Sequence, residues 1–374
     1  MQVLFDSTGS AAGLADAAGR MSERPGIEAA LVLAADGNPW ATGDVDAAIT
    51  QSPIPLIGGV FPQIAYSGDP YECGTLLIGL EQVPDIGVIE NVSDPTVAFE
   101  SAIAAFTDEW PAEQAGQTYL VVLDGLAGRI SDLVEGLFFT LGLEHNFIGG
   151  GAGSLTFERR PCIITPKGLR QDAGLIARLS VTSSIGVTHG WQAISDTFTV
   201  TESEGNTVKT IEWERAADLY AREVAQHSGI TPTEADFFSI AKSYPLGIAR
   251  FGGELVVRDP LMMNAEGELV CVGEVPAGCR IRLLNGDRET LISAAGEARE
   301  QANAASGAAE ASDSLLFDCI SRVLFLGDSL GREIAAVGGG RPVHGAFTLG
   351  EVANSGTEYL DFLNKSTVFA VFDA

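Results

Sequence analysis

The chain has 374 residues, of which 46% are hydrophobic, and this length and apolar content fit two folded domains and exclude an intrinsically disordered chain. The 50 acidic residues outnumber the 22 basic residues, which gives a formal net charge of -28. A charge of this size repels nucleic-acid phosphates and anionic membranes, so nucleic-acid binding is not expected.

Lysine is rare, since it occurs only at positions 167, 209, 242 and 365. An excess of acidic residues with few lysines is typical of a surface adapted to concentrated salt, where screening weakens self-repulsion. This composition predicts a halophilic, archaeal source, with an ordinary acidic bacterial protein as the alternative. The N-terminus lacks a basic segment followed by an apolar core, and no run of about 18 apolar residues occurs. We therefore expect a soluble, cytoplasmic protein without membrane insertion.

The first ninety residues predict strands alternating with helices. We expect strands at 3–6 and 29–35, helices at 11–21 and 45–50, and a final pair of strands ending at 80. The same order of elements recurs at 86–181 and again at 280–372. Three β-α-β-α-β-β repeats therefore predict a mixed α/β fold in which helices cover the sheets.

An additional segment separates the second and third copies. Residues 197–212 alternate as in a hairpin that turns at Gly205 and Asn206, and the helix predicted at 215–226 ends at Gly229. The following residues are rich in strand signals, so we expect a β-rich insert. We place a domain boundary between residues 212 and 213, which gives an N-terminal domain of two repeats (1–212). The second domain (213–374) then contains the insert and the third repeat.

One stretch gathers the residues most suited to a binding site. The apolar run 315–317 predicts a buried strand whose end delivers Cys319 and Arg322 to a loop, and a helix at 328–337 follows. The chain then returns through Gly345 and the pair Gly350-Glu351. An arginine, a carboxylate and glycines are thereby expected at one edge of one sheet.

These motifs resemble the FIST family. The resemblance covers most of the chain. The C-terminal signatures of the family match an apolar strand ending in Cys-x-x-Arg (319–322), the later Gly350-Glu351, and Asn364-x-x-Thr367. Gly149-Gly150, His189-Gly190 and the stretch 244–248 lie where other family signatures fall. Tyr244 and Leu363 stand where the family more often has histidine. The resemblance implies an intracellular sensory domain, non-enzymatic, with small metabolites such as amino acids or small carboxylates as ligands and a separate signalling protein as partner.

Candidate ligand-binding residues follow from side-chain chemistry. Arg322 and Arg258 each follow an apolar strand, where an arginine can clamp a ligand carboxylate through two parallel hydrogen bonds. The alternative is a structural ion pair of Arg322 with Glu351 or Glu333. Glu351 itself can accept a ligand ammonium group or orient Arg322.

The remaining candidates are three glycines, an asparagine and a threonine. Gly149, Gly150 and Gly350 permit close approach of the backbone to a ligand, or merely to the next strand. Asn364 and Thr367 offer polar side chains, and because they should point to opposite faces, only one of them is expected to line a pocket.

Two alternative functions stay open. Cys319 is a candidate nucleophile if His344 approaches it as a base, with a buried, inert thiol as the alternative. The family resemblance also allows haem, for which His189 beside Trp191 is the candidate axial ligand; no other cofactor and no metal are expected. The five cysteines form no CxxC pair, so neither a zinc site nor a disulfide framework is predicted.

Overall fold

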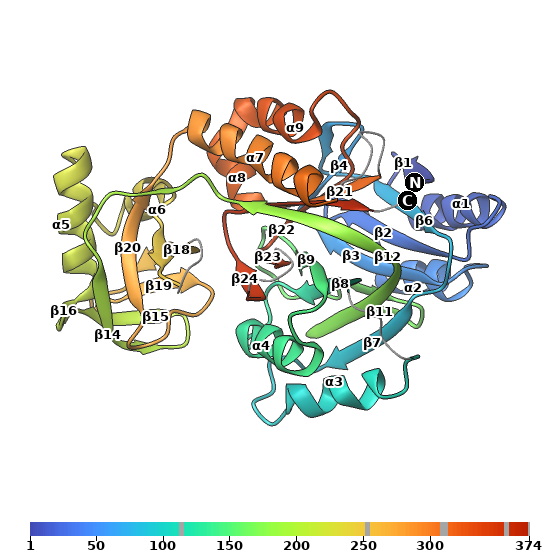
Figure 1. The fold of residues 1–374 in the computed structure, drawn as a ribbon, viewed down its shortest axis with the longest axis horizontal. Coiled ribbons are helices and arrows are strands. Elements are labelled where there is room, and N and C mark those ends of the chain that lie inside the picture. The colour runs from blue at the N-terminus through green and yellow to red at the C-terminus, as the bar shows by residue number, and fades with distance from the viewer. Residues whose placement is uncertain (112–115, 251–254, 307–312, 355–358, 373–374) are drawn as a thin grey trace.

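The computed structural model describes residues 1–111, 116–250, 255–306, 313–354 and 359–372. The described chain folds into two units that lie side by side (Figure 1). We call residues 1–191 and 286–372 the body, and residues 192–285 the barrel. The chain enters the barrel after strand β12 (Ala173–Thr188) and returns to the body at helix α7 (Arg288–Ser306). The barrel is therefore an insertion in the body.

The first sheet of the body has six strands in the order β1-β6-β2-β3-β10-β11. Only the β2–β3 pair is parallel, so the sheet is mixed. The strands are β1 (Val3–Asp6), β2 (Ala29–Ala35), β3 (Leu56–Phe61), β6 (Thr75–Leu80), β10 (Ile163–Thr165) and β11 (Gly168–Arg170).

The second sheet has eleven strands, in the order β24-β23-β9-β8-β12-β25-β21-β22-β4-β5, with β7 also paired to β12. The pairs β8–β9 and β21–β22 are parallel. The remaining strands are β4 (Gln63–Tyr66), β5 (Asp69–Tyr71), β7 (Asp85–Glu90), β8 (Gln117–Asp124), β9 (Asn146–Ala152), β21 (Ser314–Cys319), β22 (Gly345–Thr348), β23 (Glu351–Ala353), β24 (Asp361–Leu363) and β25 (Thr367–Phe372).

The two sheets pack face to face and helices cover their outer faces. In β2, Leu31 and Leu33 face the second sheet, whereas Ala30 and Val32 face helices α1 (Ala11–Ser22) and α2 (Thr42–Thr50). Helices α3 (Phe99–Thr107), α4 (Ile130–Leu141), α7 and α9 (Leu330–Gly338) pack on the outer face of the second sheet. The body is thus a four-layer α-β-β-α sandwich, and the mixed α/β class predicted from the sequence is confirmed.

Strands of the second and third predicted copies share one sheet. β8, β9 and β12 come from the second copy, and β21, β22 and β25 from the third. The first strand predicted for the third copy, β20 (Arg280–Asn285), lies in the barrel instead. The threefold repeat therefore stays a prediction.

The barrel closes because β20 pairs with both β14 and β17. Its strands are β13 (Gln192–Ala193), β14 (Phe198–Glu204), β15 (Thr207–Ile211), β16 (Glu214–Arg215), β17 (Leu246–Ile248), β18 (Val256–Met263), β19 (Leu269–Val272) and β20. Helices α5 (Ala216–Ser228) and α6 (Phe237–Ala241) contribute Tyr220 and Phe237 to its core. The boundary predicted between residues 212 and 213 lies between the paired strands β15 and β16, and as a division between family segments it stays a prediction.

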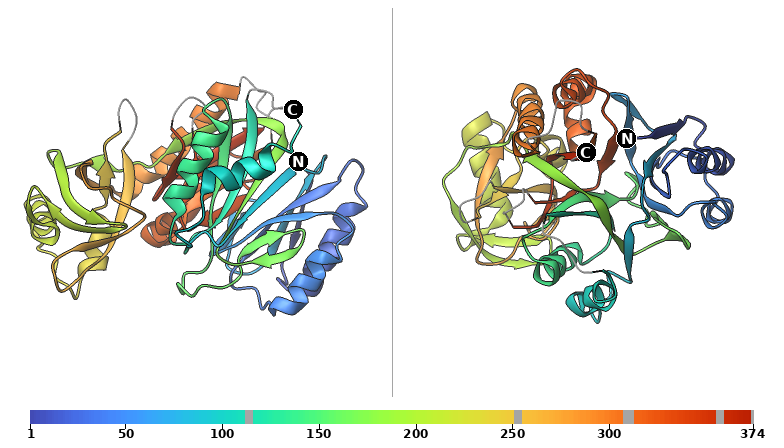
Figure 2. Two further views of the ribbon diagram at one scale, coloured as in Figure 1. Left: turned by 90° about the horizontal axis from the view of Figure 1, so that it is seen from below. Right: turned by 45° about the vertical axis from the view of Figure 1, so that its right-hand side comes forward.

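The barrel stands off from one end of the body (Figure 2). Its tethers are neighbours, because β13 pairs with β20 through Gln192 and Asn285. Across the described ranges, no helix combines the length and the apolar character that spanning a bilayer requires.

Candidate functional site

A cavity of about 480 Å³ lies between the body and the barrel. The body contributes the loop from β8 to α4, the start of α8 (Ile320–Leu326) and the turn from β22 to β23. The barrel contributes the turn between β14 and β15 and parts of β18 and β19. A cavity of this size matches those that hold small organic ligands.

The sequence places several predicted residues on this wall through two tight connections. Cys319 ends β21 and Ser321 lies in the first turn of α8, so the predicted loop is wrong: a short helix follows the strand directly. Gly350 has a φ of 89°, a left-handed conformation that favours glycine, and it turns the chain from β22 into β23. Cys319, Ser321 and Gly350 all line the cavity.

Asn364 also lines the cavity, from the turn between β24 and β25. Its side chain is 2% exposed, and neither its amide nitrogen nor its amide oxygen hydrogen bonds to any described residue. Burying an amide without partners costs free energy, roughly 1–3 kcal/mol. Asn364 therefore brings to the wall a buried amide group that has no partner among the described residues.

Asp259, from β18 of the barrel, is the second buried polar group on the wall. Its Oδ2 atom lies 3.0 Å from the Nζ atom of Lys365, whereas Oδ1 has no partner among the described residues. Burial raises the pKa of Asp259, and the Lys365 ammonium group opposes that shift. Glu274 lies on the same wall, and burial also raises the pKa of its carboxyl group.

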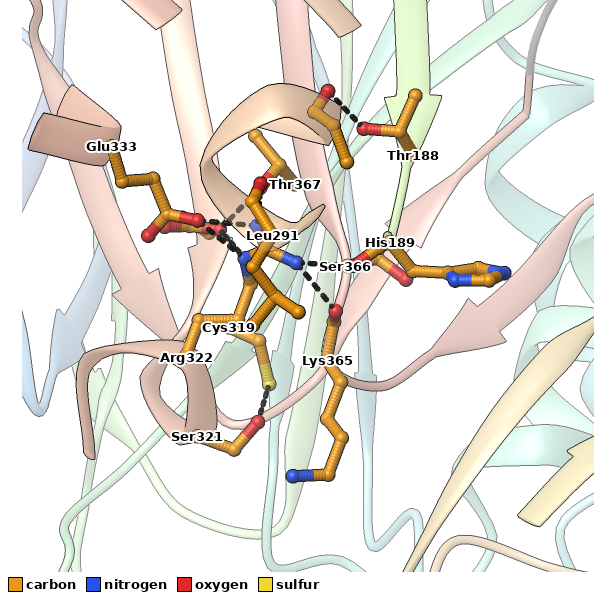
Figure 3. A network of polar contacts seen from close by, with 12 residues as sticks. Thr188, His189, Leu291, Cys319, Ser321, Arg322, Glu333, Lys365, Ser366 and Thr367 are labelled. Atoms are coloured by element: carbon orange, nitrogen blue, oxygen red, sulfur yellow. Dashed lines mark hydrogen bonds and ion pairs between the residues drawn. The ribbon is translucent and has the colours of Figure 1, made fainter. Parts of the chain in front are cut away.

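Arg322 is a fully buried structural residue and does not line the cavity. Figure 3 shows its guanidinium group directed at Glu333 and at the carbonyl groups of His189 and Lys365. Nε donates to Glu333 Oε1 at 2.8 Å, and Nη2 donates to the same oxygen and to the carbonyl of Leu291. All its N–H groups thus donate to protein acceptors. The structural ion pair of Arg322 with Glu333, one of the alternatives predicted from the sequence, is therefore present.

Arg258 is likewise directed at protein groups. Its Nη1 donates to the carbonyls of Val257 and Phe362, at 3.0 and 2.9 Å, and its Nε donates to the carbonyl of Glu274 at 2.9 Å. Burial lowers the pKa of Arg258 to about 10. Arg258 joins the barrel to β24 of the body and is not part of the cavity wall.

Glu351 is buried behind the wall rather than on it. Its Oε1 accepts from the Thr348 hydroxyl at 2.8 Å, and its Oε2 accepts from the backbone N–H of Ser366 at 3.2 Å. Burial raises the pKa of Glu351 to about 8. Its carboxyl group therefore ties β23 to the turn before β25.

Three other predicted residues serve the sheet. A Cβ atom on Gly149, whose φ is 146°, would lie 1.8 Å from the Val121 carbonyl oxygen, so this glycine permits close approach of strands β8 and β9. Gly150 pairs with Glu351 across β9 and β23. Thr367 donates to Asp318 at 2.8 Å and does not line the cavity, unlike Asn364.

The arrangement expected for a cysteine enzyme is wrong. His344 precedes β22, whereas Cys319 pairs with Thr348 at the opposite end of the same two strands. The His344 ring accepts from the Ser67 N–H instead. Burial, together with the charge of Glu351, raises the pKa of the Cys319 thiol far above its usual range, which disfavours the nucleophilic thiolate.

His189 directly follows β12 at the border with the barrel. Its Nδ1 accepts from the Trp191 backbone N–H at 2.9 Å, and its carbonyl accepts from Arg322. Burial, aided by the nearby Arg322 charge, lowers the pKa of His189 to about 4. The ring is not on the wall of the cavity between body and barrel, so this cavity does not fit haem ligation by His189.

Sequence reasoning missed Asp259, Glu274 and Asn206, which the barrel supplies to the wall. A signal for Asp259 was present, because the charged pair Arg258-Asp259 followed by Pro260 interrupts an apolar stretch. The structure places a register shift at this point, between Pro260 and Met262. Proline lacks the backbone donor of a regular ladder, which explains the irregularity.

Two family models match the chain. The FIST N domain model matches residues 28–214, and the FIST C domain model matches residues 216–354. A search of curated proteins found no match. The two matched stretches cover strands of both the body and the barrel, including most of the cavity wall. The chain therefore belongs to the FIST family of sensory domains.

Proposed function

We propose that the chain senses a small molecule bound in the cavity between the body and the barrel. The observation that carries the proposal is Asn364: a buried amide on the cavity wall, with neither polar atom bonded to a described residue. Sequences that fold well seldom leave such a group unpaired unless it has a role. A ligand that hydrogen bonds to Asn364 recovers this cost.

The ligand class expected from the sequence was amino acids or small carboxylates. The structure offers little to a ligand carboxylate, because the two arginines expected to clamp it are directed at protein acceptors. The ammonium group of an amino acid, in contrast, can pair with Asp259 or Glu274. The cavity therefore supports the amino part of the class better than the carboxylate part.

The signal is proposed to pass to a separate protein. The ligand would contact both units, so it would strengthen the contact that Asp259 and Lys365 already make between them. A change in the position of the barrel relative to the body is then available for a partner to detect.

The proposal is tested with a library of metabolites and the thermal unfolding of the purified protein. We expect at least one compound to raise the Tm of the wild type and to bind at least tenfold more weakly to the Asn364→Leu variant. Asn303→Leu is the control, because Asn303 is exposed on α7 and outside the cavity. If no compound shifts the Tm, or if both variants respond equally, the cavity is not the sensory site.

We also propose that the surface is adapted to concentrated salt, as its formal charge of -28 and its few lysines indicate. Raising KCl screens the repulsion between carboxylates, so the Tm should rise steadily toward molar KCl. A Tm that is independent of KCl would contradict the halophilic assignment.

A further inference from the structure

The polar groups on the cavity wall are acidic or neutral. The acidic groups are Asp259 and Glu274, and the neutral ones include Asn364, Asn206 and Ser321. No lysine, arginine or histidine is among the described residues of the wall, and the segments outside the description contain none. The wall therefore offers no cation to a negatively charged ligand.

The basic side chain paired with Asp259 is already committed to protein partners. The Nζ atom of Lys365 lies 3.0 Å from Asp259 Oδ2, donates to the carbonyl of Lys242 at 2.9 Å, and stands 4.8 Å from the centre of the Trp191 ring. Its side chain is only 1% exposed. A ligand carboxylate would have to displace Asp259 to reach this ammonium group.

The free oxygen of Asp259 favours a cationic ligand over an anionic one. Oδ1 is buried, lacks a partner among the described residues, and belongs to a side chain on the cavity wall. A carboxylate oxygen accepts strong hydrogen bonds from a charged N–H donor, particularly away from water. The amide oxygen of Asn364 offers a second acceptor from the residue that precedes Lys365.

The rest of the wall is largely apolar. Leu126, Leu155, Phe157, Leu261, Leu324 and Phe362 line it. These side chains favour an apolar body over a second charged group. The cavity thus combines acceptors for one cationic group with an apolar volume.

We propose that the sensed ligand is an amine without a carboxylate, with its ammonium group held by Asp259 and Asn364 and its apolar part against the leucines and phenylalanines. This inference rests on the proposed function and narrows its ligand class. The ammonium group shares Asp259 with Lys365, since each uses one carboxylate oxygen. Recognition therefore takes place at the ion pair that connects the barrel to the body.

The test uses matched compounds with the same apolar body. Hexylamine, heptanoate and heptanamide form one set, and phenethylamine, 3-phenylpropionate and 3-phenylpropionamide form the other. Affinities for the full chain are measured by calorimetry at pH 7, where the amines are cations and the acids are anions. We expect at least one amine to bind, and to bind at least tenfold more tightly than its matched acid and amide.

Two variants assign the preference to Asp259. Asp259→Asn should weaken amine binding at least tenfold; because it leaves Lys365 without its partner, the double variant Asp259→Asn with Lys365→Met provides a charge-balanced second measurement. Glu204→Gln is the control, an exposed carboxylate of the barrel paired with Lys209. It should leave amine binding unchanged.

The outcomes separate this inference from the proposed function. If acids or amides bind as tightly as the amines, if no amine binds, or if the double variant keeps full amine affinity, the amine assignment is overturned. The cavity still stands as the sensory site if any metabolite binds the wild type and loses affinity in Asn364→Leu. If nothing in the matched sets or the metabolite library binds, both proposals fail together.

Discussion

The Arg322 cluster and the cavity wall share one short turn, residues 364–366, but treat polar groups in opposite ways. On one side of this turn, the carbonyl of Lys365 accepts from Arg322, whose every N–H donates to a protein acceptor (Figure 3). On the other side, the amide of Asn364 has no partner among the described residues. Arg322, which has more hydrogen-bond donors, is therefore fully occupied by protein acceptors. The neutral amide of Asn364 has no such partner in the described part of the chain.

The largest effect on stability is expected when Arg322 is removed. Replacing Arg322 with Met leaves Asp318 and Glu333 buried without their cation, and we expect the free energy of unfolding to fall by about 3–5 kcal/mol. Arg332→Met is the control, because Arg332 makes an exposed ion pair with Glu289 and its loss should change the stability little. Urea unfolding of both variants provides the measurement. Equal losses would mean that the Arg322 cluster is not the structural centre described above.

A second test uses pH and the buried carboxyl group of Glu351. Its pKa rises from 4.5 to about 8 on folding, so between these values the folded chain binds more protons than the unfolded chain. The contribution of Glu351 is therefore most favourable below pH 4.5 and is lost as the pH rises toward 8, by an amount on the order of a few kcal/mol.

Glu351→Gln removes this titration while keeping a group that can hydrogen bond to Thr348. The difference in unfolding free energy, wild type minus variant, should therefore decrease from pH 5 to pH 8. Chemical unfolding at several pH values measures it. Parallel curves for the two proteins would show that Glu351 does not titrate in this window.

For the cavity wall, the expected change in the free energy of unfolding has the opposite sign. Asn364→Leu replaces an unpartnered buried amide by an apolar side chain of similar size, so it should stabilise the fold by about 1–2 kcal/mol. Asn354→Leu is the matched control. The Asn354 amide accepts from the Phe147 N–H and donates to the His145 carbonyl, both at 2.9 Å, so its loss should destabilise by about 1–3 kcal/mol. Thermal and urea unfolding distinguish the two, and a destabilised Asn364→Leu variant would contradict an open amide.

The smallest effect is chemical and concerns Cys319. Its thiol lines the cavity but is buried, and its raised pKa keeps it protonated. Iodoacetamide at pH 8 should therefore label the exposed Cys73 long before Cys319, as peptide mass spectrometry would show. Faster labelling at Cys319 would revive a catalytic role for this residue.

Local patterns in the sequence were sufficient to predict most of the individual elements. The hairpin turning at Gly205 and Asn206 and the helix that ends at Gly229 occur as predicted, because turn and cap residues act over a few positions. The loop expected after Cys319 is instead helix α8, since that stretch contains no glycine or proline until Gly327.

The site was harder to predict, because its composition depends on how the units meet. Asn364, Gly350 and Cys319 were among the predicted site residues, and they line the cavity. Arg322 follows the same strand, but it points to Glu333 because helix α9 packs beside it. No local pattern distinguishes an arginine that faces a cavity from one that faces a helix, and contacts such as Asp259–Lys365 join residues more than a hundred positions apart.

The position of β25 has a consequence for biosynthesis. This strand is the last element that the structure describes, yet it pairs with both β12 and β21 in the middle of the eleven-stranded sheet. During translation the barrel, whose strands all come from residues 192–285, can close early, whereas the second sheet of the body cannot be completed before β25 is synthesised. The barrel can therefore fold while the centre of the eleven-stranded sheet is still open, because β12 and β21 lack β25 between them until it is synthesised.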